Sequence, residues 1–156
     1  MGLLILAIAL YHRKYPIPIG VVFGMALVGI LHILAGNIYI SGTRIYDIWI
    51  IKNIIKMDNI VHLIGGYVSV FISYTLLIQH LDKETVIKNK LILCLILILM
   101  ASGIGALNEI FEFFAVIFFD AAQNVGNYYN NALDLLVNLF GAVIACFYVI
   151  TRHIKK

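Results

Sequence analysis

Four stretches of the chain are long and apolar enough to cross a membrane as helices. About 20 apolar residues span the roughly 30 Å hydrocarbon core of a bilayer. The third stretch is longer than one crossing requires, so we expect it to tilt, to kink near its glycines or to extend past the membrane. The predicted spans are Ile17–Ile40, Ile60–Gln79, Leu91–Phe119 and Ala132–Thr151.

Two further segments lie outside these spans. Residues 2–11 are apolar but too short to cross unaided. They lack the basic start of a signal peptide, so we expect an uncleaved fifth helix that is short or partly inserted. The loop Ser41–Met57 mixes isoleucines, tyrosines and Trp49 with basic residues. This mixture predicts an amphipathic helix along the membrane interface.

The composition makes the lipid bilayer the expected surroundings of the protein. Of the 156 residues, 63% are hydrophobic and 12% are charged, and the mean hydropathy is +1.01. A soluble domain is usually about 45–50% apolar and about 25% charged. The predicted fold is therefore an all-α polytopic membrane helical bundle of four full transmembrane helices plus a short N-terminal apolar helix. Residues 1–156 are expected to form a single integral membrane domain.

The basic residues predict how this multi-pass protein is oriented in the cell membrane. Short cytoplasmic loops carry an excess of Lys and Arg. If all four spans cross, the C-terminus is cytoplasmic and the loop Asp120–Asn131 faces outward. The net charge of +3 is a topology signal and does not indicate a nucleic-acid partner. Eight of the eleven basic residues then share the cytoplasmic face: Arg13, Lys14, Lys83, Lys88, Lys90, Arg152, Lys155 and Lys156.

Small residues within the spans are expected to serve packing. Cys94 and Cys146 fall in apolar runs, which indicates small hydrophobic side chains and not a disulfide framework. Glycines let helices approach closely in a membrane. The glycines expected at such contacts are Gly65, Gly66, Gly103, Gly105 and Gly141.

Polar residues inside the spans gather toward the predicted outer side. At about 1.5 Å per residue, they lie at a similar depth on four helices, while the inner halves are almost purely apolar. Residues three or four apart share a helix face. This spacing relates Asp58 to His62, Glu109 to Glu112 and Asp134 to Asn138. The full set is His32, Asp58, His62, Asn108, Glu109, Glu112, Asp134 and Asn138.

The four acids of this set need something to offset their charge. An ionisable group at mid-membrane costs roughly 2.5–3.5 kcal/mol even on insertion scales. Protonation, a bound cation, water in a cavity, or Arg44 folding inward from its loop would each reduce that cost. Carboxylates with imidazole suit a divalent metal ion, although the Glu-x-x-His signature of di-metal helical bundles is absent.

Structural roles compete with this interpretation at most positions. Asp58 could be a helix N-cap, and Asp134 could be a first-turn acid favoured by the helix dipole. The histidines and the asparagines Asn108 and Asn138 could join neighbouring helices by hydrogen bonds. Glu109 and Glu112 lie too deep for such explanations, so a function is favoured for them.

Three motifs in order resemble a known family. Asp58-Asn-Ile-Val-His62, Asn108-Glu109-Ile-Phe-Glu112 and Asp134-Leu-Leu-Val-Asn138-Leu-Phe-Gly141-Ala142 resemble the YjdF-like small integral membrane proteins. The same order is similar to that of the VanZ-like family, which usually has Glu-x-x-Gln where this chain has Glu112. VanZ-like proteins are linked to glycopeptide (teicoplanin) resistance. The resemblance implies a common site and the cell envelope, and it implies no particular reaction.

The leading functional hypothesis is a membrane-embedded, metal-assisted enzyme acting on a lipid or lipid-linked cell-envelope substrate at the outer leaflet. A divalent cation of unspecified identity is its expected cofactor, and one of the carboxylates or His32 would act as general base. The expected catalytic residues are Glu109, Glu112, His62 and His32. The expected metal ligands are Glu109, Glu112, His62, Asp134 and Asp58, with Asn138 and Asn108 nearby.

Two other classes of function remain open. Chains of intramembrane acids and histidines also mark proton- or cation-coupled transporters and channels. Against a transporter, the inner halves are apolar and the chain has no repeated halves, although an oligomer could still build a pore. A non-catalytic partner of another membrane complex would not need acids at this depth.

Overall fold

Four long helices dominate the computed structural model, which describes residues 11–120, 127–152 and 154. All four are long and apolar enough to cross a membrane. This confirms the prediction of a polytopic helical membrane bundle. The predicted helix over residues 2–11 lies outside the described residues apart from Tyr11. In order, the elements are α2 (Ile19–Asn37), β1 (Tyr39–Ile40), β2 (Thr43–Arg44), the 3-10 helix η1 (Ile45–Asp47), β3 (Trp49–Ile51), β4 (Ile55–Lys56), α3 (Met57–Ile78), α4 (Lys83–Lys88), α5 (Lys90–Phe119) and α7 (Tyr128–Arg152).

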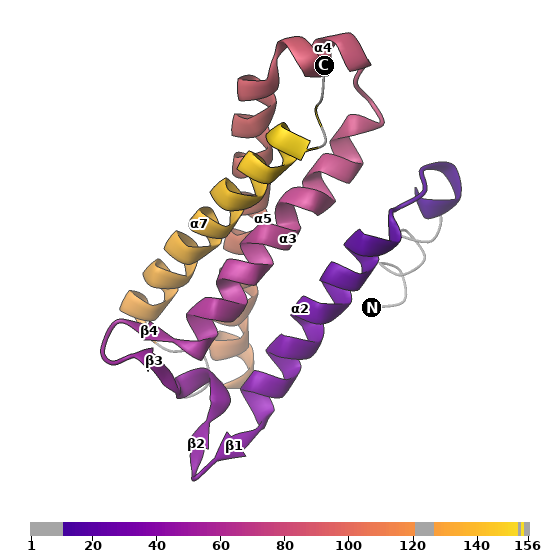
Figure 1. The fold of residues 1–156 in the computed structure, drawn as a ribbon. Coiled ribbons are helices and arrows are strands. Elements are labelled where there is room, and N and C mark those ends of the chain that lie inside the picture. The colour runs from indigo at the N-terminus through magenta and orange to yellow at the C-terminus, as the bar shows by residue number, and fades with distance from the viewer. Residues whose placement is uncertain (1–10, 121–126, 153, 155–156) are drawn as a thin grey trace.

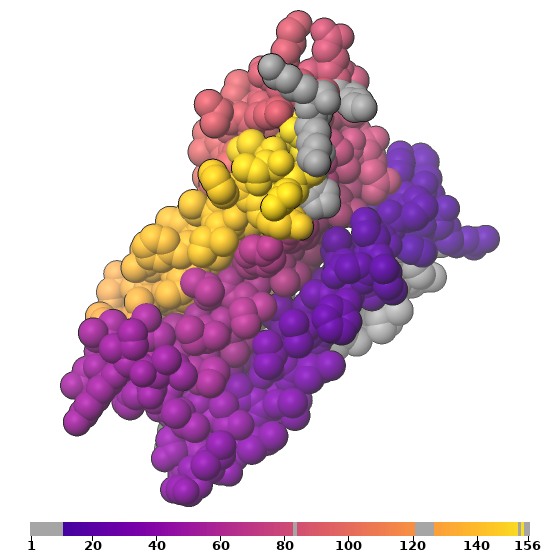
Figure 2. Space-filling view, in the orientation of Figure 1, coloured from indigo at the N-terminus to yellow at the C-terminus, as the bar shows by residue number. Residues whose placement is uncertain are grey.

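Helix α3 lies at the centre of the bundle, between α7 and α2, and α5 packs behind it (Figure 1). The strands and η1 lie at one end, together with the first turns of α3 and α7 and the last turns of α2 and α5. We call this the hairpin end, and the opposite end, which carries α4, the α4 end. Helix α2 runs along one flank of the molecule beside α3 (Figure 2).

The loop between the first two spans is not the predicted amphipathic helix. It forms two antiparallel hairpins, β1–β2 and β3–β4, on either side of η1. Ser41 and Gly42 have φ angles of 50° and 81° and connect β1 to β2. Positive φ at both central residues is what a tight two-residue hairpin turn requires. The helical bundle stands as predicted, and only the loop differs, because its turn residues favour hairpins over an amphipathic helix.

Side-chain caps explain why α3 and α7 begin earlier than predicted. The Asn59 side chain accepts a hydrogen bond from the backbone N–H of Lys56 (2.8 Å) and so closes the start of α3. The Asn127 side chain accepts from the backbone N–H of Asn130 (3.1 Å) at the start of α7. Asp58 therefore is not the N-cap, and its side chain is available for contacts inside the bundle.

Helices α3 and α7 approach each other closely because glycines face the opposing backbone. A Cβ on Gly66 would overlap the backbone carbonyl of Asn138, and a Cβ on Gly141 would overlap that of Leu63. Gly105 on α5 lies against the Asn138 side chain. The packing role is confirmed at these three glycines, whereas a Cβ on Gly103 would meet nothing within 4 Å.

The apolar core lies toward the α4 end, where Val70, Leu97 and Val149 are fully buried. Cys94 and Cys146 join α5 to α7 by a disulfide in this region, with Cα atoms 5.7 Å apart. This corrects the expectation of two separate hydrophobic cysteines, since the helices bring together residues that are 52 positions apart. Large apolar side chains on the outer faces of the helices remain exposed, which suits contact with lipid.

Candidate functional site

Four helices bring the polar residues singled out by the sequence to the hairpin end. Each helix contributes from the half nearest that end, so the residues share a depth. They are His32 on α2; Asp58 and His62 on α3; Asn108, Glu109 and Glu112 on α5; and Asp134 and Asn138 on α7. His62, Glu109, Asp134 and Asn138 are buried.

His62 lies at the centre of this group and contacts three of its members. Its Nε2 atom is 3.5 Å from Asp58 Oδ1, one turn earlier on α3. Its Nδ1 atom is 3.6 Å from Glu109 Oε1 on α5 and 3.2 Å from the Asn138 amide nitrogen on α7. One imidazole therefore joins the three most closely packed helices, and its orientation is fixed from both sides of the ring.

Two overlapping groups of potential metal ligands include His62. One consists of Asp58, His62 and Asp134, and the other of His62, Glu109 and Glu112. In each group, one ligand atom from every residue lies within 4.8 Å of the others. Carboxylate and imidazole ligands at such separations can converge on one divalent cation.

The aspartates are held by an amide network that the sequence did not indicate. Asn130 donates from one amide nitrogen to Asp134 Oδ2 (2.6 Å) and to Asp58 Oδ2 (3.0 Å). Asn59, which is almost fully buried, donates to Asp134 Oδ1 (2.7 Å). Both oxygens of Asp134 thus accept hydrogen bonds. Asn130 lies four residues before Asp134 and Asn59 three residues before His62, so helix spacing could have identified both.

The two glutamates differ in their hydrogen bonding. Glu112 Oε1 accepts from the Asn108 amide (2.8 Å), its neighbour one turn earlier. Glu109 is only 8% exposed, and neither of its carboxylate oxygens accepts a hydrogen bond from the residues that the structure describes. A buried carboxylate without hydrogen bonds is costly, so Glu109 is the position where a bound cation or a proton would stabilise the site most.

His32 enters the site through a loop residue that has no sequence signal. The Tyr46 hydroxyl, from η1, shares a short hydrogen bond with His32 Nδ1. Burial, and then the nearby carboxylate of Asp58, raises the pKa of Tyr46, so the phenol remains neutral. A Cβ added to Gly36 would lie 3.6 Å from the Tyr46 ring, which is an ordinary van der Waals contact. The His32 and His62 ring centroids are 6.5 Å apart.

Two cavities reach the cluster from the α2 side. The larger, about 450 Å³, is polar and has His32, Asp58, Glu112 and Arg44 in its wall. The smaller, about 120 Å³, is lined in part by His32, His62 and Asn138. Arg44 does fold toward the site, and its Nε atom pairs with Asp47 Oδ2 at 2.9 Å. Two of the four carboxylates, Asp58 and Glu112, therefore line the larger cavity, in whose wall Arg44 already has an acidic partner.

The half of the bundle between the site and the α4 end is less apolar than the sequence suggested. Ser69 and Ser73 on α3 are both buried. Their spacing from His62 repeats the three- and four-residue intervals of one helix face. A serine within an apolar run does not stand out as a site residue, because serines commonly pack at helix contacts in membranes.

The fold and the site define the class of this protein: a multi-pass helical membrane protein with an acid–histidine cluster buried at one end of its bundle. The chain belongs to the family described as "Predicted membrane protein (DUF2238)", whose model matches residues 1–155. No curated protein and no solved structure matches the chain.

Proposed function

We propose that this protein is a metal-assisted enzyme that acts on a lipid or lipid-linked substrate of the cell envelope at the outer leaflet. The observation that carries the proposal is the group formed by His62, Glu109 and Glu112, whose ligand atoms lie within 4.8 Å of one another. Two carboxylates and one imidazole neutralise a divalent cation and offer it ligands of the usual types.

We assign the cation to the glutamate side of His62. Glu109 has two buried oxygens without hydrogen bonds among the described residues, whereas both oxygens of Asp134 are occupied by amides. Asp58 would then act as a positioning residue, since it contacts the other ring nitrogen of His62 at 3.5 Å. A carboxylate on the second nitrogen is the usual way in which a metal-binding histidine is oriented.

The remaining residues suggest how protons would move in such a site. A divalent cation there would activate a water molecule and polarise the group under attack. His32 borders both cavities and is held by Tyr46, which makes it the candidate general base. The cavity of about 450 Å³ beside His32 and Glu112 would admit the polar part of a substrate from the membrane surface.

The outer leaflet and the cell membrane follow from two sequence features. The excess of basic residues at the α4 end predicts that this end is cytoplasmic, so the hairpin end would face outward. The resemblance to the YjdF-like and VanZ-like families implies the cell envelope. Labelling of a cysteine at position 155 from outside intact cells would contradict this orientation.

A proton- or cation-coupled transporter is the second candidate, and one observation favours it. The buried hydroxyls of Ser69 and Ser73 continue from His62 along α3 toward the α4 end. Intramembrane chains of this kind can carry protons. In that case Glu109 and Glu112 would be protonated hydrogen-bonding groups and would not need a metal.

Metal-dependent thermal unfolding separates the two candidates. We expect Mg²⁺, Mn²⁺ or Zn²⁺ to raise the melting temperature of the purified protein above its value in chelator, because a cation that binds only the folded state stabilises it. Glu112→Gln removes one charge with little change of shape and should reduce the metal-induced shift without unfolding the protein. Glu84→Gln, on exposed α4, is the matched control and should keep the full shift.

Unmoved melting curves would count against the metal site. If chelator and all three cations leave the native protein unchanged, the acids are better explained as protonated groups, and the transporter becomes the leading candidate. A shift that Glu112→Gln retains in full would remove Glu112 from the ligands and leave the metal elsewhere.

A further inference from the structure

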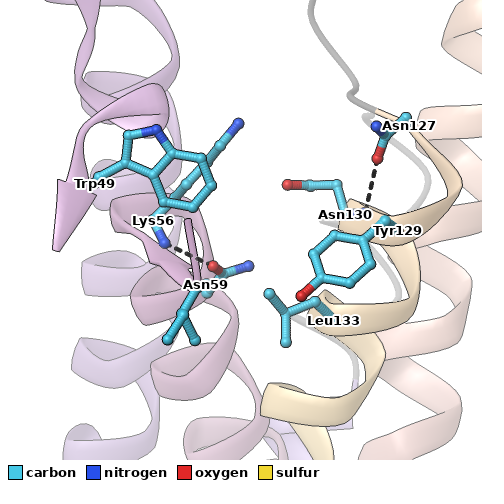
Figure 3. Close-up of a pocket in the computed structure, with 8 residues that line it drawn as sticks. Trp49, Lys56, Asn59, Asn127, Tyr129, Asn130 and Leu133 are labelled. Atoms are coloured by element: carbon cyan, nitrogen blue, oxygen red, sulfur yellow. Dashed lines mark hydrogen bonds between the residues drawn. The ribbon is translucent and has the colours of Figure 1, made fainter. Parts of the chain in front are cut away.

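A pocket at the hairpin end, outside the acid–histidine cluster, combines aromatic and amide side chains. It has a volume of about 220 Å³ and lies between the β3–β4 hairpin and the first turns of α3 and α7. Trp49 and Tyr129 lie on opposite sides of it, with Lys56 and Asn59 below Trp49 and Asn130 beside Tyr129 (Figure 3). The volume corresponds to about seven water molecules at about 30 Å³ each, which suits one ring-sized polar group.

We propose that this pocket binds a neutral sugar ring, the headgroup of a lipid-linked substrate. A sugar presents hydroxyl groups at its rim and C–H groups on its face. Amides offer both donors and acceptors to hydroxyls, and the negative face of an aromatic ring attracts the weakly positive C–H groups. The binding step stands on the pocket alone, and only the role of the sugar as substrate rests on the proposed function.

The charges around the pocket argue against an ionic ligand. The Lys56 ammonium is 3.3 Å from Asp47 Oδ1, and Asp47 also pairs with Arg44, so this carboxylate offsets part of the Lys56 charge. Asp58 and Asp134 lie directly behind Asn130 and would repel an anion such as phosphate. A quaternary ammonium ion would compete with Lys56, whose Nζ atom is 5.3 Å from the centre of the Trp49 ring.

The amide groups connect the pocket to the cluster. The amide nitrogens of Asn59 and Asn130 donate to the aspartates, so these side chains form a shared wall. The side-chain carbonyl oxygen of Asn130 and the side-chain amide nitrogen of Asn127 are not used in these hydrogen bonds and can serve a ligand. A sugar held there lies one side chain away from Asp58, the residue proposed to position His62.

Anchoring in the membrane interface is the alternative role for the two aromatic residues. Trp and Tyr are enriched where the bilayer meets water, and both side chains are at least partly exposed. An interfacial anchor needs no particular neighbours, whereas here three asparagines and Lys56 line the space between the rings. The two roles differ in one measurable property, which is saturable binding of a free sugar.

Trp49 is the only tryptophan in the chain, so its fluorescence reports directly on the pocket. The full-length protein is purified in a polyoxyethylene detergent, because a glycoside detergent would itself occupy the site. It is titrated with methyl glucoside and with methyl N-acetylglucosaminide, and separately with inorganic phosphate and with choline. We expect a saturable change in Trp49 emission with at least one glycoside and none with phosphate or choline.

Two neighbouring tyrosines provide matched variants. Tyr129→Ala removes one wall of the pocket and should weaken glycoside binding at least tenfold. Tyr128→Ala alters a more exposed side chain outside the pocket and should bind as the native protein does. Melting temperatures of both variants establish that each is folded, and Trp49→Phe should abolish the signal.

The possible outcomes separate this inference from the proposed function. No saturable change with either glycoside, an equal affinity in Tyr129→Ala, or a matching response to phosphate or choline would overturn the sugar site. Glu112→Gln should keep glycoside binding while its metal-dependent stabilisation is reduced. No change in Trp49 emission, together with a metal-induced rise in melting temperature, would refute the sugar site alone. A saturable change in emission without a metal-induced rise would refute the metal site alone.

Discussion

At the α4 end, helices α3, α5 and α7 meet through apolar side chains such as Val70, Leu97 and Val149, all fully buried. At the hairpin end, the same three helices meet through an imidazole, carboxylates and amides centred on His62. The helices are continuous between the two ends, so the contrast arises from side chains and not from a change of architecture.

The contrast indicates that the two ends serve different purposes. Close apolar packing stabilises a membrane bundle through dispersion contacts. A carboxylate such as Glu109, buried without hydrogen bonds from the described residues, has the opposite effect unless something binds it. The stability that apolar packing gives at the α4 end can thus offset the free energy lost by burying a polar cluster at the hairpin end. Three substitutions test this division of labour.

The largest effect is expected at the close contact between α3 and α7, which both ends require. Gly141→Val places a side chain on the backbone carbonyl of Leu63. Overpacking against backbone should cost about 3 kcal/mol or more, and we expect loss of monodisperse protein in size-exclusion chromatography. The same change at Gly103, where a Cβ meets nothing within 4 Å, is the control. Equal behaviour of the two variants would refute the close contact.

An intermediate effect is expected in the apolar core. Leu97→Ala should lower stability by about 2 kcal/mol, the low end for a buried leucine, because the alternative surroundings are lipid and not water. The melting temperature should fall equally with metal and with chelator, since Leu97 is remote from the cluster. Leu99→Ala, on the exposed face of the same helix, should change little. A Leu97→Ala variant that lost the metal-induced shift would mean that the two ends are not independent.

The smallest effect, with the opposite sign, is expected for Glu109→Gln. Removing one of several like charges should raise stability in chelator by about 1 kcal/mol, because like charges at such separations repel by at least that much. The same variant should lose the metal-induced rise in melting temperature. A melting temperature in chelator below that of the native protein would show that Glu109 stabilises the fold. The two ends would then not differ in the way proposed.

The sequence alone determined the membrane bundle, its four spans and the residues that gather at one end. Long apolar runs leave few alternatives to transmembrane helices. An acid at mid-membrane depth is conspicuous because it is so costly, which is why Glu109 and Glu112 were identified without a structure. Helix spacing then grouped Asp58 with His62, since a regular helix fixes which residues share a face.

The contacts among these residues, and the further residues that take part in them, come from the packing of the helices and the loop. Tyr46 reaches His32 from a loop whose first hairpin depends on the positive φ of Ser41 and Gly42. Asn59 meets Asp134 across 75 positions of sequence. Such contacts depend on how the helices pack, and a helical period carries no information about the rotation of one helix against another. The disulfide between Cys94 and Cys146 escaped prediction for the same reason.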